Sequence, residues 1–243
     1  MRIAVVSDIH ANLAALEAVL AEIDAEPPDE LWCLGDLVGY GPRPSECTEA
    51  VAARAAICLA GNHDLAVIGK LDLLEFSGEA GDAARWTREV LTNAAREYLD
   101  GLEPAGMRDG IALFHASARD PVWEYVLSDD VAEATLELAG TPLVLVGHSH
   151  AALQVAFRDD GSLDGGLAPA GTEVDLAGGR VLLNPGSVGQ PRDGDPRAAW
   201  LLLDTDAQTA SFRRVDYDIE RTQTEIRAAG LPELLAIRLA GGL

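Results

Sequence analysis

The stretch RIAVVSDIHANLAALEAVLAEI, residues 2–23, contains the first strand and the first helix that the sequence predicts. Residues 2–8 form a short, almost wholly apolar run rich in β-branched residues, which is typical of a central strand buried on both faces. Asn12 is placed to cap the helix that follows, and the apolar residues of that helix recur on one stripe. A buried strand that leads directly into an amphipathic helix indicates an α/β fold.

The same pattern repeats within the first sixty residues. Pro27 and Pro28 end the helix, and residues 30–36 form a second buried strand. Pro44 opens a second helix, and residues 55–61 form a third strand. Strand, helix, strand, helix and strand in this order predict a parallel sheet with right-handed crossovers.

The rest of the chain predicts further helices and a second sheet. Helices are expected over 78–103, near 129–139 and over 219–239, with buried strands over 111–115 and 142–148. Beyond residue 150 the character changes, and Gly, Asp and Pro turns separate strands over 153–157, 180–184, 198–204 and 210–218. We therefore expect residues 1–243 to form a single domain with a second, antiparallel or mixed sheet and with helices outside.

The net charge of the chain argues against stable binding to nucleic acids and to anionic membranes. Forty acidic residues against eighteen basic ones give a formal net charge of −22, and the acidic residues are spread along the chain. Such a surface repels phosphate backbones and anionic lipid headgroups, so stable nucleic-acid binding and membrane binding are not expected. A local metal site can still bind one phosphate group.

The cysteines and the apolar segments indicate a cytoplasmic protein. Cys33, Cys47 and Cys58 are odd in number, lie in or beside apolar segments and form no CxxC pair, which is typical of buried free thiols in a reducing compartment. The N-terminal apolar run is too short for a signal peptide, and no other segment has the length of a membrane span.

All five histidines follow the ends of predicted strands, together with other polar residues. These residues are Asp8 and His10, Asp36, the run Asn62, His63 and Asp64, His115, and finally His148 and His150. The carboxyl edge of an open α/β sheet is where ligands bind. A single histidine at a strand end is usually a turn residue whose ring nitrogens have hydrogen-bond partners, but five histidines at one edge predict a functional site.

The residue types at this edge indicate divalent metal ions. Imidazole nitrogens with carboxylate and amide oxygens, and without thiolates, suit manganese, iron, cobalt, zinc or nickel. The number of side chains is high for one ion but fits two, held about 3.5–4 Å apart if Asp36 bridges them. Paired ions at that spacing are used to activate water and to bind two oxygens of a phosphoryl group.

These motifs resemble those of the calcineurin-like metallophosphoesterase superfamily. The family series D-x-H, G-D, G-N-H-D/E, H and G-H-x-H is present in order, as 8–10, 35–36, 61–64, 115 and 147–150. The resemblance implies an α/β four-layer sandwich with two mixed β-sheets flanked by helices. It also implies two ligand sets, the first being Asp8, His10, Asp36 and His150, and the second Asp36, Asn62, His115 and His148.

The resemblance gives His63 and Asp64 catalytic roles. His63 would meet the substrate phosphate and protonate the leaving oxygen, and Asp64 would accept a hydrogen bond from the other ring nitrogen of His63. In this interpretation the segment 61–64 is a tight turn, and Gly61 lets the backbone turn sharply there.

Longer stretches resemble the small prokaryotic phosphodiesterase branch of the superfamily. They are SDIHANLAALEAVL, GDLVGYGPRPSE and LNPGSVGQPR. The resemblance implies that the substrate mouth is lined by Tyr40, Arg43, Asn184, Ser187 and Arg192. A structural turn beside the site is an equal explanation of NPGSVGQPR, whereas Arg43 and Arg192 are preferred because few cations are present to meet an anion.

The expected function is hydrolysis of phosphodiester or phosphomonoester bonds by attack of metal-bound hydroxide, with His63 as general acid. Manganese is the expected ion, with iron, zinc, nickel and cobalt as alternatives, and the substrate is a small phosphate ester such as a nucleotide. The alternatives are a catalytically silent scaffold of the same fold, a dinucleoside polyphosphate hydrolase, and a DNA-processing nuclease, which the charge disfavours. A homo-oligomer is compatible with the sequence.

An α/β-hydrolase is a further alternative, because GHSHA around Ser149 resembles a nucleophile elbow. That elbow must open a helix, whereas residues 153–157 alternate like a strand. No histidine follows Ser149 except His150, so the triad cannot be assembled in the required chain order.

Overall fold

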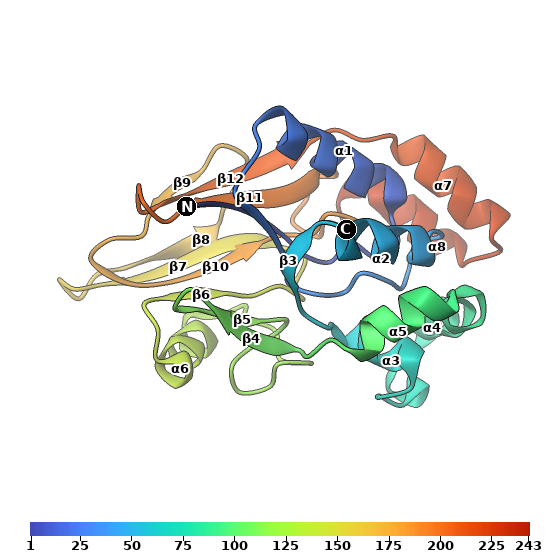
Figure 1. Cartoon of the computed structure of the whole chain (residues 1–243), viewed down its shortest axis with the longest axis horizontal. Coiled ribbons are helices and arrows are strands. Elements are labelled where there is room, and N and C mark those ends of the chain that lie inside the picture. Colours follow the sequence, from blue (N-terminus) through green and yellow to red (C-terminus); the bar gives the residue numbers. More distant parts are fainter.

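The computed structural model describes residues 1–243 and contains two six-stranded sheets stacked face to face (Figure 1). Sheet A contains, in spatial order, β3 (Ala55–Cys58), β2 (Glu30–Cys33), β1 (Arg2–Val6), β11 (Ala198–Asp204), β12 (Thr209–Val215) and β9 (Glu173–Asp175). Sheet B contains β4 (Ala105–Arg108), β5 (Ile111–Phe114), β6 (Leu143–Leu145), β10 (Gly179–Pro185), β7 (Ala152–Arg158) and β8 (Leu163–Leu167).

Helices cover both outer faces of the stacked sheets. The α-helices are α1 (Leu13–Ala25), α2 (Pro44–Ala52), α3 (Asn62–Ile68), α4 (Gly78–Val90), α5 (Asn93–Asp100), α6 (Asp129–Ala139), α7 (Ile219–Ala228) and α8 (Glu233–Ile237). Two 3₁₀ helices, η1 (Leu73–Glu75) and η2 (Arg238–Gly241), complete the set. In Figure 1, α1 lies above sheet A and α6 lies below sheet B, so the layer order is helix, sheet, sheet, helix.

Alternating side chains explain the layers. In β1, Ile3 and Val5 lie in the apolar core between the two sheets, whereas Ala4 and Val6 lie in the core beneath α1. Successive side chains of a strand point to opposite faces of the sheet. A strand that is apolar on both faces must therefore be covered by other elements on both faces. The expected four-layer α/β sandwich with two mixed sheets is therefore confirmed.

The assignment of strands to sheets differs from the expectation. β5 and β6 belong to sheet B, and the late strands β11 and β12 return to sheet A, where β11 pairs antiparallel with β1. Leu201 and Leu203 of β11 face the core between the sheets, while Trp200 and Leu202 face the core beneath α1. Residues 198–204 form a strand as predicted, but this strand belongs to the sheet of β1 and not to the second sheet, because its apolar pattern does not identify the neighbouring strand.

The predicted strands 2–8, 30–36 and 55–61 end earlier, at Val6, Cys33 and Cys58, because the polar residues that follow lie in loops. Five short elements were not predicted: α3, η1, β4, β8 and β9. The segment expected to be a tight turn at 61–64 is the start of α3, with Gly61 as its N-cap. All residues of β8, whose sequence is LDGGL, are exposed, so this strand shows no alternation of apolar and polar residues by which it could be predicted.

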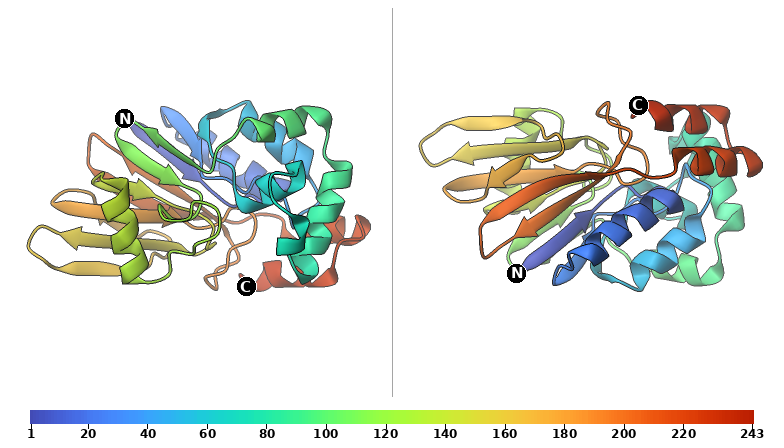
Figure 2. Two further views of the ribbon diagram at one scale, coloured as in Figure 1. Left: turned by 90° about the horizontal axis from the view of Figure 1, so that it is seen from below. Right: turned by 90° about the horizontal axis from the view of Figure 1, so that it is seen from above.

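Most of the helices gather at one end of the sandwich, as both views in Figure 2 show. β1 runs from the N-terminus toward that end, and β2 and β3 are parallel to it. The carboxyl ends of these strands therefore meet the helical end of the molecule.

Candidate metal centre

Loops from both sheets bring the predicted residues together. Asp8 and His10 follow β1, Asp36 follows β2, and Asn62 opens α3 just after β3. From sheet B, His115 follows β5, and His148 and His150 follow β6, which is parallel to β5. All seven side chains are buried, so the site lies where the strand ends of the two sheets meet.

The backbone at these loops adopts a strained conformation at most of the candidate ligands. Five of the seven residues have positive φ angles, which non-glycine residues rarely adopt. They are Asp8 (53°), His10 (49°), Asp36 (53°), His148 (64°) and His150 (58°). Hydrogen bonds between the loops hold this conformation, for example from the amide of His10 to the carbonyl of Asp36 at 2.9 Å. Strain of this kind is found at functional sites, where the surrounding structure fixes it.

The side chains form two groups that share one residue. Asp8, His10, Asp36 and His150 form the first group, and Asp36, His115 and His148 form the second, each with its candidate ligand atoms within 4.8 Å of one another. Oδ2 of Asp36 lies 3.5 Å from Nε2 of His10 and 3.6 Å from Nε2 of His115. A single carboxylate oxygen therefore faces both groups.

Each of the four clustered histidines has one ring nitrogen within hydrogen-bond distance of a main-chain carbonyl. The pairs are His10 Nδ1 with Val38 (3.0 Å), His115 Nδ1 with Leu34 (2.9 Å), His150 Nδ1 with Gln190 (2.6 Å) and His148 Nε2 with Trp123 (3.2 Å). A carbonyl oxygen only accepts, so the proton must lie on that nitrogen, and the other nitrogen keeps its lone pair. This is how metal-binding histidines are usually oriented.

Several atoms that face the cluster have no hydrogen-bond partner although they are buried. They are Oδ1 of Asp8, Oδ2 of Asp36, Oδ1 of Asn62 and Nε2 of His115. A buried polar atom without a partner is costly, and these are lone-pair atoms of hard or borderline donors. The residues present therefore fit divalent cations, which would satisfy these atoms.

The electrostatics of the cluster agree with this fit. Burial raises the pKa of Asp8 to about 7, and burial together with the nearby Asp64 and Asp8 charges raises the pKa of Asp36 well above its usual range. Burial lowers the pKa of His148 to about 4 and holds the pKa of His115 well below its usual range. His115 and His148 are therefore neutral, as metal ligands must be, and a bound cation would lower the pKa of the two aspartates.

His63 lies beside the cluster, and the predicted hydrogen bond to Asp64 is absent. Nδ1 of His63 is buried without a partner. The carboxylate of Asp64 instead accepts three main-chain N–H groups, from Leu37 (2.9 Å), Val38 (3.1 Å) and Gly61 (2.9 Å). Asp64 is at the third position of α3, where a carboxylate turns back toward the N-cap amide and cannot also reach the His63 ring.

The expected role of Gly61 as a sharp turn is also wrong. Its φ of −94° and ψ of 176° are extended values that other residues adopt. Glycine is needed for space, because a Cβ atom at Gly61 would lie 2.0 Å from Oδ1 of Asp36. At Gly39, a Cβ atom would lie 2.4 Å from Nδ1 of His63, so this glycine makes room for the histidine ring.

Two of the five predicted mouth residues lie at the cluster. The ring of Tyr40 is 4.6 Å from the His10 ring and 4.4 Å from the His63 ring, measured between centroids. The guanidinium of Arg192 lies over Tyr40, 5.6 Å from its ring centroid. These two side chains therefore lie beside the histidines of the cluster.

The other three predicted mouth residues have structural partners. Asn184 is fully buried and donates to the carbonyl of Gly147, and Ser187 donates to the carbonyl of Asp8, so both brace the loops that carry the candidate ligands. The turn interpretation of NPGSVGQPR therefore accounts for these two residues. The guanidinium of Arg43 forms ion pairs with Glu46 and Glu225, which compensate its charge.

Aromatic residues at the rim were not predicted. Phe76 makes an edge contact with His63 at 4.9 Å between centroids, and Tyr125 stacks on His148 at 4.1 Å. Trp123 contacts Phe76 and supplies the carbonyl that orients His148. These residues lie outside the five motifs. Any residue type can supply a main-chain carbonyl, so the role of Trp123 as an acceptor could not be predicted from the sequence.

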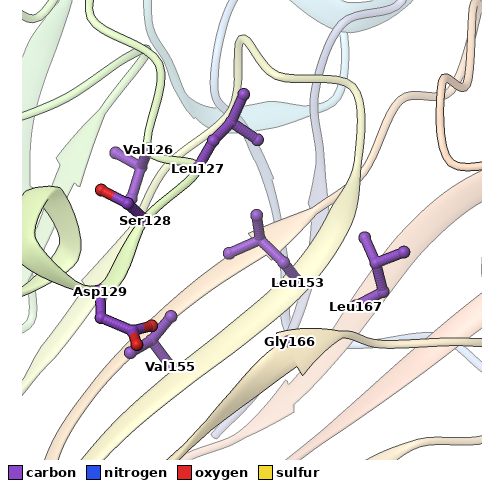
Figure 3. A pocket seen from close by; sticks show the side chains of 8 residues that line it. All are labelled: Val126, Leu127, Ser128, Asp129, Leu153, Val155, Gly166 and Leu167. Atoms are coloured by element: carbon purple, nitrogen blue, oxygen red, sulfur yellow. The ribbon is translucent and has the colours of Figure 1, made fainter.

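An apolar hollow of about 210 Å³ lies elsewhere, on the outer face of sheet B (Figure 3). It is lined by Val126, Leu127, Ser128, Asp129, Leu153, Val155, Gly166 and Leu167. None of these residues belongs to the metal-ligating groups, so the chemistry of the cluster, rather than the presence of a hollow, locates the site.

Comparison with known proteins gives the family. The model of the calcineurin-like phosphoesterase superfamily domain matches residues 1–208, most of the chain. This chain belongs to that superfamily. Members of the calcineurin-like phosphoesterase superfamily are generally metal-dependent hydrolases, and the two groups of possible ligands described above agree with that chemistry.

Individual relatives of this calcineurin-like phosphoesterase extend the comparison. A metallophosphoesterase from Sphaerobacter thermophilus of known crystal structure is 43% identical, with a TM-score of 0.90, covering 100% of this chain and 99% of that chain. An uncharacterized protein of Methanocaldococcus jannaschii is 37% identical over 98% of this chain and 96% of its own length. A symmetrical bis(5′-nucleosyl)-tetraphosphatase of Pseudomonas putida is 32% identical over 133 residues, which is 49% of this chain and 42% of that protein. None of the helices here is long and apolar enough to cross a membrane.

Proposed function

We propose that residues 1–243 form a single-domain phosphoric ester hydrolase that uses two divalent ions to cleave small phosphodiesters or phosphomonoesters. The observation that carries the proposal is the position of Asp36, which belongs to both groups and whose Oδ2 lies 3.5 Å from Nε2 of His10 and 3.6 Å from Nε2 of His115. A carboxylate shared between two ligand groups offsets the repulsion between two dications, and paired ions are characteristic of phosphoryl chemistry.

In this proposal Asp8, His10, Asp36 and His150 hold one ion, and Asp36, Asn62, His115 and His148 hold the other. When bound, the ions would activate a water molecule and stabilise negative charge on the phosphoryl oxygens. Manganese is the proposed ion, because a thiolate-free set of imidazole, carboxylate and amide ligands suits it; iron, zinc, nickel and cobalt suit the same set.

His63 is the proposed general acid. It is the one histidine outside both ligand groups, and its ring packs against the rings of His10, Tyr40 and Phe76. Burial, followed by the charge of Arg192, lowers its pKa to about 3. A bound phosphate would bring negative charge beside the ring and favour its protonated form, which can then donate to the leaving oxygen.

A dinucleoside polyphosphate is a second candidate substrate. The similarity to the Pseudomonas putida tetraphosphatase favours it, although that similarity spans only part of both proteins. The corresponding test is whether diadenosine tetraphosphate is cleaved, with chromatography of the nucleotide products.

The primary test is restoration of activity by metals. Protein stripped of metal is assayed with bis(p-nitrophenyl) phosphate and p-nitrophenyl phosphate after addition of Mn, Ni, Co, Zn or Mg. We expect metal-dependent hydrolysis, and the ratio of the two rates shows whether diesters or monoesters are preferred. If two ions bind per chain but neither these esters nor diadenosine tetraphosphate is cleaved with any metal, a catalytically silent scaffold replaces the proposed hydrolase.

Replacement of His63 tests its role as an acid. We expect His63→Ala to keep both ions, measured by elemental analysis, and to lower turnover of a phenyl ester by about 10²- to 10⁴-fold, the usual scale for general acid catalysis. Turnover of the matching p-nitrophenyl ester should fall less, because that leaving group needs less protonation. Equal losses for the two esters would assign His63 to binding or structure instead.

A further inference from the structure

Tyr125 is the one exposed aromatic residue of the protein. The chain has four tryptophans, four tyrosines and four phenylalanines, and all of them except Tyr125 are buried or half-buried. Tyr125 keeps 44% of its surface accessible to solvent. A single exposed apolar side chain is ordinary by itself, so the meaning of this exposure depends on where the ring lies.

The ring of Tyr125 lies against the candidate metal centre. It stacks on the imidazole of His148, with the ring centroids 4.1 Å apart and the ring planes 16° from parallel. His148 belongs to the second ligand group, together with Asp36 and His115. One face of the Tyr125 ring is thus covered by a candidate ligand, and the exposed surface of the ring lies next to the metal centre.

His148 is oriented by other residues as well. Its Nε2 lies 3.2 Å from the carbonyl oxygen of Trp123, and its main-chain amide donates to Oδ2 of Asp8 at 3.1 Å. Packing against Tyr125 adds to this arrangement, but it does not require that the tyrosine ring stay open to solvent. Support of His148 therefore accounts for the covered face of Tyr125 and not for its exposed surface.

The loop that carries Tyr125 is fixed on both sides of this residue. The carboxylate of Glu124 accepts hydrogen bonds from the side chains of Ser117 and Arg119. On the other side, Val126 is buried and belongs to the apolar core beneath α6. The ring is therefore held in place before a ligand arrives, which reduces the entropic cost of binding.

The other aromatic rings near the centre offer less open surface. Phe76 is buried and packs against His63 and Trp123, with centroid distances of 4.9 Å and 5.3 Å. Trp123 is half-buried, and so is Tyr40, whose ring contacts His63. Tyr125 is therefore the most accessible aromatic surface beside the metal centre.

We propose that Tyr125 binds a planar aromatic group of the substrate by stacking, while a phosphoryl group of the same substrate lies at the metal centre. The substrate class is then a phosphate ester whose alcohol carries an aromatic ring, such as a nucleotide. Stacking tolerates any base, because every base has a flat π face. It also suits a chain with a net charge of −22, since a neutral ring needs no cationic partner. The inference rests on the proposed function for the position of the phosphoryl group.

Two matched ligands test the inference without turnover. One is the phosphonate analogue of adenosine 5′-monophosphate, in which a methylene group replaces the ester oxygen. The other is the same analogue of methyl ribofuranoside 5-phosphate, which has no base. Calorimetry measures the dissociation constant of each ligand with the protein at saturating manganese. We expect the adenosine analogue to bind at least about fivefold more tightly, which is the lower end of what stacking of one base supplies.

Tyr125→Phe should keep this preference, and Tyr125→Leu should lose most of it, because phenylalanine can stack on a base and leucine cannot. The ratio of the two dissociation constants separates stacking from support of the metal centre. A weakened centre lowers both affinities by the same factor and leaves the ratio unchanged.

The matched control is Leu127→Ala, which removes an exposed apolar side chain from the same loop. We expect this control to keep the wild-type ratio. Three results would each overturn the stacking site: no preference for the adenosine analogue in the wild-type protein, an unchanged ratio in Tyr125→Leu, or an equal loss of preference in Leu127→Ala.

The two proposals fail in different ways. A protein that hydrolyses p-nitrophenyl esters but binds the two analogues equally retains the proposed function without the stacking site. A protein that prefers the adenosine analogue through Tyr125 but cleaves no ester, with any metal, retains the stacking site and loses the hydrolase.

Discussion

Gly61 shows how tightly single residues are fitted around Asp36. A Cβ atom at Gly61 would lie 2.0 Å from Oδ1 of Asp36 and 2.6 Å from its main-chain nitrogen. The side chain of Asp36 cannot rotate away without moving the oxygen that faces both ligand groups, and its backbone is held by the neighbouring loops. Even one methyl group at Gly61 therefore has no place to go.

We expect Gly61→Ala to lower the free energy of unfolding by about 1–3 kcal/mol or more, the usual cost of overpacking, and to weaken metal binding. Urea denaturation and metal titration measure the two effects. Gly101→Ala is the matched control, because its φ is −81° and the nearest atom to an added Cβ would be 3.5 Å away. Similar stabilities for the two variants would contradict the packing argument.

At the residue scale the sequence predicts which side chains gather, but not what each atom contacts. Chain order and residue type locate the seven candidate ligands, because strand ends meet at one edge. The partner of Asp64 could not be predicted, since an acidic residue next to a histidine also occupies the third position of a helix. The resemblance likewise places Asn184 and Ser187 at the mouth, whereas the structure has Asn184 donating to Gly147 and Ser149 and Ser187 donating to the carbonyl of Asp8.

At the scale of elements, α3 is fastened to the loop after β2 by one carboxylate. The oxygen atoms of Asp64 accept from Leu37 and Val38 on that loop and from Gly61 at the start of α3. Burial raises the pKa of Asp64 to about 7, against the lowering effect of these main-chain donors. Asp64 therefore fixes the distance between the loop that carries Asp36 and the helix that carries Asn62.

We expect Asp64→Asn to lower the free energy of unfolding by about 1–3 kcal/mol, because the new amide would place a donor against a buried main-chain donor. Asp72→Asn is the control: Asp72 caps η1 at an exposed position, where asparagine serves equally well. Urea denaturation measures both variants. An Asp64→Asn variant of normal stability that loses only turnover would support the role of orienting His63 instead.

At the scale of the whole molecule, we expect the buried cluster to make stability depend on metal binding. Asp8 and Asp36 are buried and burial raises their pKa values, so cations that bind these residues only in the folded state would stabilise that state. An ion at 100 times its dissociation constant contributes roughly 2.7 kcal/mol. A chain of this size then melts roughly 5–10 °C higher.

Scanning calorimetry with and without manganese measures this effect. We expect chelation to lower the melting temperature and restored manganese to raise it again. Asp36→Asn should lose most of the response, because Asp36 belongs to both ligand groups. An unchanged melting temperature at saturating manganese in the wild-type protein would contradict the coupling.

The layers of the sandwich could be predicted from the sequence, but the strand order of the sheets could not. Periodicity shows that a strand is buried on one face or two, and so it anticipates helices outside and two sheets inside. The pairing of β1 with β11 joins residues almost two hundred positions apart, and apolar alternation is the same for any buried partner. Short exposed strands such as β8 carry no periodic signal at all.

The candidate ligands come from the ends of both sheets, and this gives the ions a further use as reporters of assembly. Asp8 and Asp36 follow strands of sheet A, whereas His115, His148 and His150 follow strands of sheet B. Neither sheet alone offers a complete ligand set. In a refolding experiment with cobalt, the visible absorption of tightly bound ions would therefore appear only after the two sheets had packed together. The rate at which this absorption rises would measure the rate of that packing step.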